Sequence, residues 1–306
     1  MRTLTCLVLS LFSLPVLASP APPIIGGSKA KPGEWPDVVA VLGSKGACSG
    51  TLIAPDLVLT AGHCIEIEPE LVIANTVDYA DATAGDRIRV KSARAYPNWE
   101  HSYDVGILVL DHVARETPRA IATACAANDL LGARKPVEVI GFGLTSPSGT
   151  GDNTVLHAAS LPVLDPTCAS DVACEPAVRP NGEFTAGGRG TDSCFGDSGG
   201  PAMIATRSGP ALAGVVSRGF GLPGIPCGNG GVYVRADKVT AWIESVTGRK
   251  LARAACDGHG DDPETSAVES DPADGGGCSA GGGTELALGV ALCAGVWRRR
   301  RRQSRQ

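Results

Sequence analysis

The sequence predicts an all-β fold, and three features of its composition and patterning indicate this class. Glycine and proline are frequent, at 40 and 22 of 306 residues, as expected for a chain with many turns. Short runs of Val, Ile and Leu lie between these turn residues, with the length typical of strands. Aromatic residues make up only 4% of the chain, so the core must be mainly aliphatic. The length gives a prior of about two domains.

The predicted strands follow one another along the chain. Residues 87–91 alternate between charged and apolar side chains, as a half-exposed strand should. Buried strands are expected where apolar residues are continuous, at 38–42, 57–59, 137–140, 212–216 and 232–234. One helix is predicted where apolar residues recur at helical spacing between 239 and 246, with Asp237 as a plausible cap.

Three short motifs place a histidine, a carboxylate and a serine in this order along the chain. Residues 60–64 are Thr-Ala-Gly-His-Cys, 104–108 are Asp-Val-Gly-Ile-Leu, and 196–201 are Gly-Asp-Ser-Gly-Gly-Pro. An imidazole can take the proton of a serine hydroxyl, and a buried carboxylate can hold that imidazole in the required tautomer. We therefore interpret Ser198 as a nucleophile, His63 as its base and Asp104 as the group that orients the base.

Each motif alone has a simpler explanation, because a lone Gly-Asp-Ser-Gly is usually a turn and an isolated His or Asp is more often structural. Their joint presence favours catalysis. An esterase or lipase would normally carry its serine in a Gly-x-Ser-x-Gly elbow with the histidine last, whereas in this chain the histidine comes first. The other histidines lack a comparable setting and are expected at the surface: His101, His112, His157 and His259.

Over about residues 24–246 the chain resembles the trypsin/chymotrypsin-like serine endopeptidases, through these motifs and the start Ile-Ile-Gly-Gly at 24–27. The resemblance implies two antiparallel Greek-key β-barrels with a C-terminal helix, divided near residue 130, with the triad in the cleft between them. It implies an oxyanion hole formed by the amides of Gly196 and Ser198. Protein or peptide substrates are the expected partners, and no cofactor is expected. The alternative is a catalytically silent homologue that acts as a binding module.

The resemblance also implies a specificity pocket. Its floor lies six residues before the serine, at Asp192, which predicts cleavage after Arg or Lys. The other pocket positions are Ser193, Ser217, Gly219 and Gly231. Two features depart from the family: Arg218 replaces an aromatic residue, and 222–226 lengthen a loop. Arg218 could disfavour basic residues at neighbouring subsites. In the alternative interpretation, an arginine of the chain pairs with Asp192 and blocks the pocket.

The cysteines fit an exported protein with disulfides. The resemblance implies the pairs Cys48–Cys64 and Cys194–Cys227. Thr185 stands at the position where the family has the partner of Cys168, and Cys174 is the obvious substitute. Whether the two remaining cysteines of this region, Cys125 and Cys256, pair is left open. No metal is expected, because the sequence contains neither a CxxC…CxxC pattern nor, in 65–78, a recognisable calcium loop.

The N-terminal residues 1–18 have a basic residue, an apolar stretch and a small-residue end, which predict a secretory signal peptide. A short pro-segment, 19–23, would precede the protease domain, 24–256. In the family a freed α-ammonium pairs with the aspartate beside the serine, which implies Ile24 and Asp197 here. Because Pro23 precedes Ile24, an enzyme selecting Arg or Lys cannot release it, and another peptidase is expected. Alternatively the switch is absent and the extension stays attached.

Residues 257–277 are rich in Gly, Pro, Ser and Asp and predict a flexible linker. Its seven acids largely account for the net charge of −5, so this charge says nothing about the substrate. Residues 278–306 contain Cys278, an apolar stretch and an arginine run, and resemble the C-terminal sorting signals of exported myxobacterial proteins. That resemblance implies processing or lipidation at Cys278, sorting machinery as a partner, and membrane contact only through this tail. A secreted or cell-surface location is expected, and no nucleic-acid binding.

Overall fold

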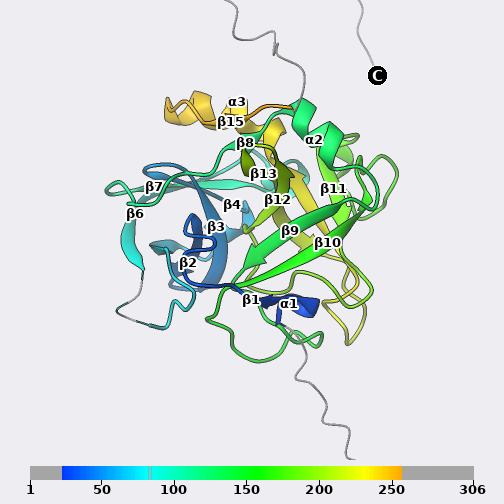
Figure 1. Cartoon of the computed structure of the whole chain (residues 1–306), viewed down its shortest axis with the longest axis horizontal. Coiled ribbons are helices and arrows are strands. Elements are labelled where there is room, and N and C mark those ends of the chain that lie inside the picture. Colours follow the sequence, from blue (N-terminus) through cyan, green and yellow to red (C-terminus); the bar gives the residue numbers. More distant parts are fainter. Residues whose placement is uncertain (1–22, 82, 84, 257–306) are drawn as a thin grey trace, which may run out of the picture. The chain divides into compact units, whose positions relative to one another are not determined.

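The first half of the fold is a closed antiparallel β-barrel (Figure 1). The computed structural model describes residues 23–81, 83 and 85–256. The order of the strands around the barrel is β2-β3-β4-β7-β6-β5. In chain order the strands are β2 (Val38–Gly43), β3 (Gly46–Ala54), β4 (Leu57–Thr60), β5 (Pro69–Ala74), β6 (Asp86–Ala95) and β7 (Gly106–Leu110).

A second barrel follows with the same strand order, β9-β10-β11-β14-β13-β12, and closes where β12 pairs with β9. Its strands are β9 (Pro136–Gly141), β10 (His157–Asp165), β11 (Glu183–Ala186), β12 (Pro201–Thr206), β13 (Gly209–Gly219) and β14 (Gly231–Arg235). Short strands β1 (Ser28–Lys29), β8 (Ile121–Ala122) and β15 (Arg253–Ala254) extend this sheet. In each barrel the fourth strand returns to pair with the first, which confirms the predicted pair of Greek-key barrels.

Six short helical segments connect or cover the barrels in the described residues. They are α1 (Pro23–Gly26), η1 (His63–Ile65), η2 (Trp99–His101), α2 (Ala124–Leu130), η3 (Pro176–Val178) and α3 (Ala236–Thr247). The helix α3 confirms the helical period, because Val239 and Ile243 on its apolar face are fully buried. The prediction of Asp237 as its cap is wrong. The N-cap position is Arg235, and Asp237 lies in the first turn, where its carboxylate binds the Arg235 guanidinium.

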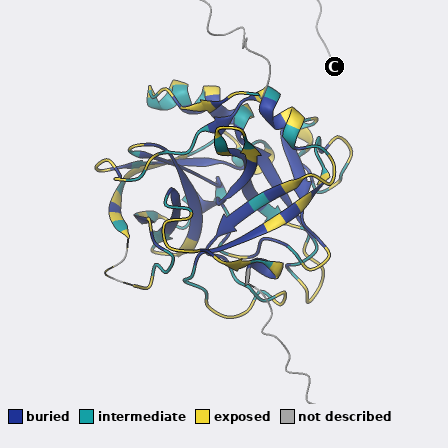
Figure 2. Ribbon diagram, in the orientation of Figure 1, coloured by how far each residue is buried: buried dark blue, intermediate teal, exposed yellow. Residues whose placement is uncertain are grey.

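The core is aliphatic, and part of it lies between the barrels. One buried cluster joins Val38 and Ile53 of the first barrel to Ile140, Met203 and Val234 of the second. The strands at the centre of Figure 2 are accordingly buried over most of their length. All the predicted strand segments lie within strands of the structure. The segment 87–91 also has the predicted alternation, with a buried Ile88 between exposed arginines.

One histidine contradicts its predicted exposure. His157 is only 2% exposed, because it begins β10 and lies in the sheet between Gly141 and Lys29. Burial lowers the pKa of His157 to about 4, so the ring is neutral near pH 7. His101 and His112 are exposed as predicted, and His259 lies outside the described residues.

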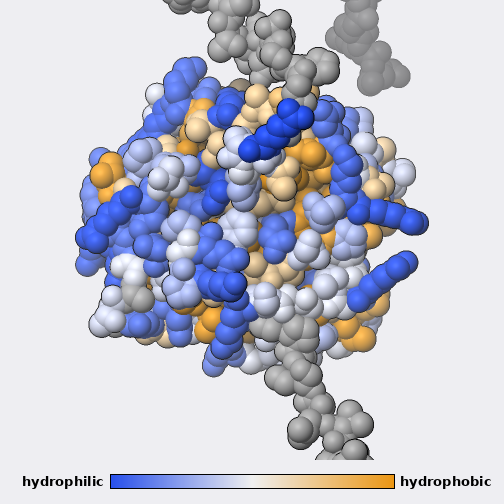
Figure 3. Space-filling model, viewed as in Figure 1, coloured by the Kyte–Doolittle hydropathy of each residue, from blue (hydrophilic) through white to orange (hydrophobic). Residues whose placement is uncertain are grey.

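The surface seen in Figure 3 carries mainly hydrophilic side chains, with small separate apolar areas. Among the residues that the structure describes, no helix is long and apolar enough to cross a membrane. The predicted signal peptide, linker and sorting tail fall outside those residues.

Four disulfides link cysteines of the described chain. Cys48–Cys64 ties β3 to η1, and Cys194–Cys227 ties together two loops of the second barrel. Cys168–Cys174 joins two cysteines that are six positions apart. Cys125–Cys256, the pair that the sequence left open, fixes α2 to the segment after β15.

Candidate active site

The first barrel positions a histidine and an aspartate that hydrogen-bond directly. His63 begins η1, just after β4, and Asp104 lies two residues before β7. The His63 backbone amide donates to Asp104 Oδ1 at 3.0 Å, and the His63 Nδ1 lies 2.9 Å from Asp104 Oδ2. A carboxylate only accepts hydrogen bonds, so Nδ1 carries the proton and Nε2 is free to act as a base.

The Asp104 carboxylate is buried and has three hydrogen-bond donors. Besides the two from His63, the Ser217 hydroxyl donates to Asp104 Oδ2 at 2.7 Å. Burial alone would raise the pKa of Asp104, but these hydrogen bonds and the nearby His63 outweigh burial and hold its pKa below the ordinary value. Asp104 is therefore charged at neutral pH and can stabilise a protonated His63.

The second barrel contributes Ser198, on a tight turn pressed against the first barrel. Gly199 has a φ of +80°, and a Cβ at this position would lie 2.0 Å from Thr60 Oγ1 and 2.4 Å from Ser49 O. The Ser49 amide donates to Ser198 O at 2.9 Å, across the boundary between the barrels. Ser198, His63 and Asp104 line the same cavity of about 470 Å³. Within the described residues, the Ser198 hydroxyl makes no hydrogen bond to His63, as is common before substrate binds.

Two backbone amides beside Ser198 remain available. In the turn, the amides of Asp197, Gly199 and Gly200 donate to backbone oxygens. Those of Gly196 and Ser198 donate to no group in the described part of the protein. Gly196 has a φ of +98°, a conformation that favours glycine. Two unoccupied amides next to a hydroxyl can bind an oxyanion that forms there.

A buried carboxylate lies near the cavity. Asp192 Oδ2 accepts hydrogen bonds from the amides of Gly228 and Gly230, at 2.8 and 3.0 Å, while Asp192 Oδ1 is buried and has no partner in the described residues. Burial raises the pKa of Asp192, although these amides act in the opposite direction. No arginine of the described chain bonds to it, unlike in the blocked-pocket alternative.

Three of the predicted pocket residues line the cavity, and two do not. Ser193, Ser217 and Gly219 line the cavity, whereas Asp192 is fully buried and is not part of its lining. A Cβ at Gly231 would lie 2.9 Å from Arg218 O, 3.5 Å from Ser193 Oγ and 3.7 Å from Asp192 Oδ1, so a side chain at this position would press on the backbone of β13 and line the space beside Ser193 and Asp192.

Arg218 also lines the cavity, where the sequence predicts a cation beside the cleft, and its charge is paired. Its guanidinium forms a two-pronged ion pair with Glu183, at 2.8 and 3.0 Å, and the Glu183 side chain is fully buried. Glu183 was missed in the sequence, because nothing in its neighbourhood marks it as a partner of a residue 35 positions away.

The segment that begins at Ile24 packs into the second barrel. Ile24 is fully buried, and the Ile25 carbonyl accepts a hydrogen bond from the Asp192 amide at 3.0 Å. Asp197 is fully buried too, and its two oxygens accept hydrogen bonds from the amides of Gly143 and Cys194, both at 2.8 Å. Burial raises the pKa of Asp197 to about 7. This carboxyl has no cationic partner in the described residues while Ile24 remains joined to Pro23.

Potential metal donors gather at three places in the described residues. The groups are Cys48 with His63 and Cys64, Cys125 with Asp129 and Cys256, and Cys168 with Cys174 and Glu183. Each contains a disulfide-bonded cysteine pair. A sulfur in a disulfide is not the thiolate that binds metals, so none of the three offers a thiolate ligand set.

Together these features define a protein of two Greek-key barrels with a histidine, an aspartate and a serine in the cleft between them. The family model of trypsin matches residues 24–243, which is more than half of the chain. The chain belongs to the trypsin family.

Proposed function

We propose that this protein is a serine endopeptidase that acts through an acyl-enzyme intermediate. The observation that carries the proposal is the shared cavity, in which an oriented His63 and Ser198 lie beside two free amides. The three side chains come from both barrels, and a purely structural cleft would not need this combination of base, nucleophile and anion-binding amides.

In the proposed reaction, His63 Nε2 takes the Ser198 hydroxyl proton while Ser198 Oγ attacks the scissile carbonyl. The amides of Gly196 and Ser198 stabilise the resulting oxyanion, and Asp104 stabilises the imidazolium. His63 then gives the proton to the leaving amine, and the C–N bond breaks. Water, deprotonated by His63, releases the acyl group from Ser198 in the second half of the reaction.

Asp192 supports a preference for Arg or Lys before the scissile bond. A guanidinium or ammonium group reaching Asp192 Oδ1 would supply the partner that this buried oxygen lacks. An apolar side chain would leave the carboxyl oxygen unpaired and would be rejected.

Labelling with a fluorophosphonate probe tests the enzymatic proposal. We expect the processed protein to be labelled at Ser198 and to hydrolyse peptides, and Ser198→Ala to lose both properties. Absence of labelling in a folded protein, or equal hydrolysis by Ser198→Ala, would instead favour the binding-module alternative.

Profiling on a peptide library tests specificity separately. We expect cleavage after Arg and Lys, and a loss of that preference in Asp192→Ser. A preference of the unmodified protein for Phe, Leu or Ala at this position would overturn the assignment of Asp192 while leaving the endopeptidase proposal intact.

Maturation is proposed to free the α-ammonium of Ile24, which would pair with Asp197 and order the oxyanion hole. Support comes from the burial of both residues and from the raised pKa of Asp197. An Arg- or Lys-selective enzyme cannot cleave after Pro23, so a proline-tolerant peptidase or stepwise trimming is expected. Full activity with Pro23 still attached, undiminished by Ile24→Gly, would show that the switch is absent.

Export is proposed to precede this step, since four disulfides form most readily in an oxidising compartment. The proposal includes signal removal after residue 18 and sorting through the tail that contains Cys278. Intact-mass analysis of secreted and cell-associated protein tests both, and retention of 1–18 in exported material would contradict it.

A further inference from the structure

Arg218 uses every hydrogen-bond donor that it has, although it lies at the edge of the cleft. A guanidinium has five N–H groups. Arg218 Nε and Nη2 donate to Ala173 O at 3.1 and 2.8 Å, Nη1 and Nη2 donate to Glu183, and Nη1 also donates to Ser217 Oγ at 3.0 Å. The guanidinium thereby links the loop containing Ala173, strand β11 and the residue that contacts Asp104.

The bond from Arg218 determines which way the Ser217 hydroxyl points. A hydroxyl has one proton to donate, and a guanidinium has no acceptor. Because Arg218 occupies an acceptor site of Ser217 Oγ, the hydroxyl proton cannot point to it and is directed at Asp104 Oδ2, 2.7 Å away.

Glu183 neutralises the charge of the Arg218 guanidinium. Its side chain is fully buried, and Oε2 also accepts a hydrogen bond from the Glu175 amide at 2.7 Å, so the carboxylate is fixed in place. A two-pronged ion pair holds a guanidinium in one orientation better than a single contact does. The Arg218 side chain is 37% exposed, so substrate can cover it without breaking the pair.

We infer that Arg218, held by Glu183, is a positioning residue that fixes the Ser217 hydroxyl as a donor to Asp104 and so holds His63 in its productive orientation. The inference rests on the proposed endopeptidase function. The chain of contacts runs from Glu183 through Arg218, Ser217 and Asp104 to His63, with each step a hydrogen bond of 3.0 Å or less.

The test removes both charges together, in Arg218→Met/Glu183→Met. Removing one partner would leave a buried charge and threaten folding, whereas apolar replacement of the whole pair is often neutral for stability. We expect kcat to fall about three- to tenfold, the worth of one net hydrogen bond, with KM little changed. Arg218→Lys, which keeps the charge, should retain part of the lost rate.

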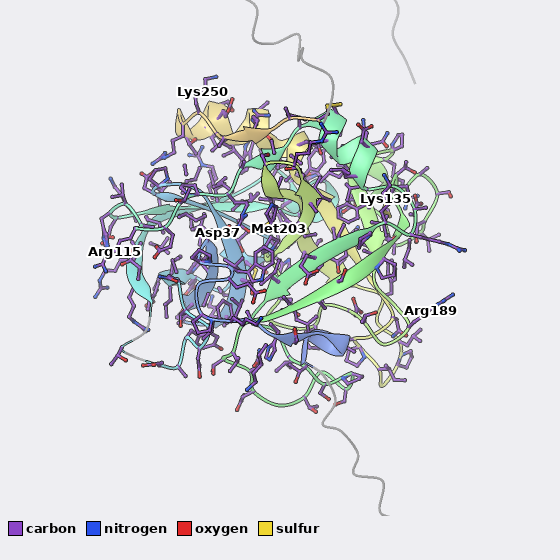
Figure 4. All side chains as sticks on the ribbon, in the orientation of Figure 1. Asp37, Arg115, Lys135, Arg189, Met203 and Lys250 are labelled. Atoms are coloured by element: carbon purple, nitrogen blue, oxygen red, sulfur yellow. A yellow bond between two sulfur atoms is a disulfide. The ribbon has the colours of Figure 1, made fainter. Side chains whose placement is uncertain are left out.

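A matched control removes an ion pair that lies away from the cavity. Arg119 Nε donates to the buried Asp37 at 2.7 Å, and Asp37 is labelled near the middle of Figure 4. We expect Asp37→Met/Arg119→Met to leave kcat unchanged. An equal loss of kcat in the control would mean that any buried pair has this effect, and would overturn the inference.

A double-mutant cycle identifies the route. In a Ser217→Ala background, Arg218→Met/Glu183→Met should cause no further loss of kcat, because the hydroxyl through which Arg218 acts is gone. Independent, additive losses would show that Arg218 acts otherwise. A rise in KM with unchanged kcat would show that Arg218 is a substrate-binding residue rather than a positioning one.

A readout that needs no turnover separates this inference from the proposed function. Nitrogen NMR of histidine-labelled protein, assigned with His63→Ala, reports exchange of the His63 Nδ1 proton with water. We expect several-fold faster exchange in Arg218→Met/Glu183→Met, and unchanged exchange would overturn the inference. If the unmodified protein fails to react with a fluorophosphonate, the proposed function fails while the exchange measurement still decides the role of Arg218.

Discussion

The two barrels have the same strand order but hold their buried aspartates in opposite ways. Asp104, beside the first barrel's β7, receives donors from His63 and Ser217, and its pKa lies below the ordinary value. Asp197, in the second barrel, receives two backbone amides and no side-chain donor from the part of the chain that the structure describes, and burial raises its pKa to about 7. Asp104 therefore has the hydrogen-bond donors that stabilise its charged form. Asp197 has no cation among the described residues that would do the same.

This difference shows which half of the site is preformed. The first barrel builds its half from side chains next to regular strands, locked by direct hydrogen bonds. The second barrel builds its half from the turn that contains Ser198. The amides of Gly196 and Ser198 in this turn can bind an oxyanion only if the Asp197 carboxyl between them is fixed in place. The first half should therefore tolerate changes in processing, and the second should depend on them.

The largest expected effect tests the preformed half. Asp104→Asn should lower kcat about 10⁴-fold, because an amide can stabilise the wrong imidazole tautomer and cannot stabilise the imidazolium. The oxyanion-hole amides should remain in place, so the melting temperature should change little. Kinetics and thermal unfolding measured on the same preparation check this. A large drop in stability would show that Asp104 is needed for folding rather than for catalysis.

The pH dependence of stability tests the half of the site that the second barrel contributes, which contains Asp197. Burial moves the pKa of Asp197 from 3.8 to about 7, so folding favours the protonated carboxyl. Its contribution is present at low pH and is lost as the pH rises through about 7. The protein that retains Pro23 should lose on the order of 4 kcal/mol of unfolding free energy between pH 4 and 8, relative to Asp197→Asn.

Processed protein is the control for that titration. A freed Ile24 ammonium would stabilise the charged form of Asp197, so the loss of unfolding free energy between pH 4 and 8 should disappear. Asp104, whose pKa is lowered, has the opposite sign and loses its contribution as the pH falls. Denaturant unfolding across this range measures both effects, and identical curves for processed and unprocessed protein would argue against the ion pair.

A smaller effect is expected where the two barrels touch. Gly199→Ala should lower kcat about 10²-fold, since its methyl group would displace the Ser198 turn from Thr60 and Ser49. Gly209→Ala is the matched control: its φ is +113°, but no described atom lies within 4 Å of the added Cβ. If the two variants lost the same activity, backbone strain rather than contact between the barrels would be responsible.

Local patterns were sufficient for much of the fold. The apolar runs and the alternation at 87–91 predicted strands, and the period at 239–246 predicted α3, because these signals depend on neighbours within a few residues. The barrel closure came from a resemblance, since pairing such as β12 with β9 joins residues about 60 positions apart. The misplaced cap at Asp237 shows the usual limit at helix ends, where a tertiary partner such as Arg235 competes for the side chain.

The sequence by itself determined the chemistry on offer: which residues can act as nucleophile, base and carboxylates, and in what order. Only the tertiary structure decided their electrostatic state. It buried His157 in a sheet and joined Arg218 to Glu183, and within the described residues it left Asp197 with no cation while Asp104 received three donors. Charge and hydrogen-bond energies depend on distances of a few ångströms between residues far apart in the chain, and local sequence does not contain those distances.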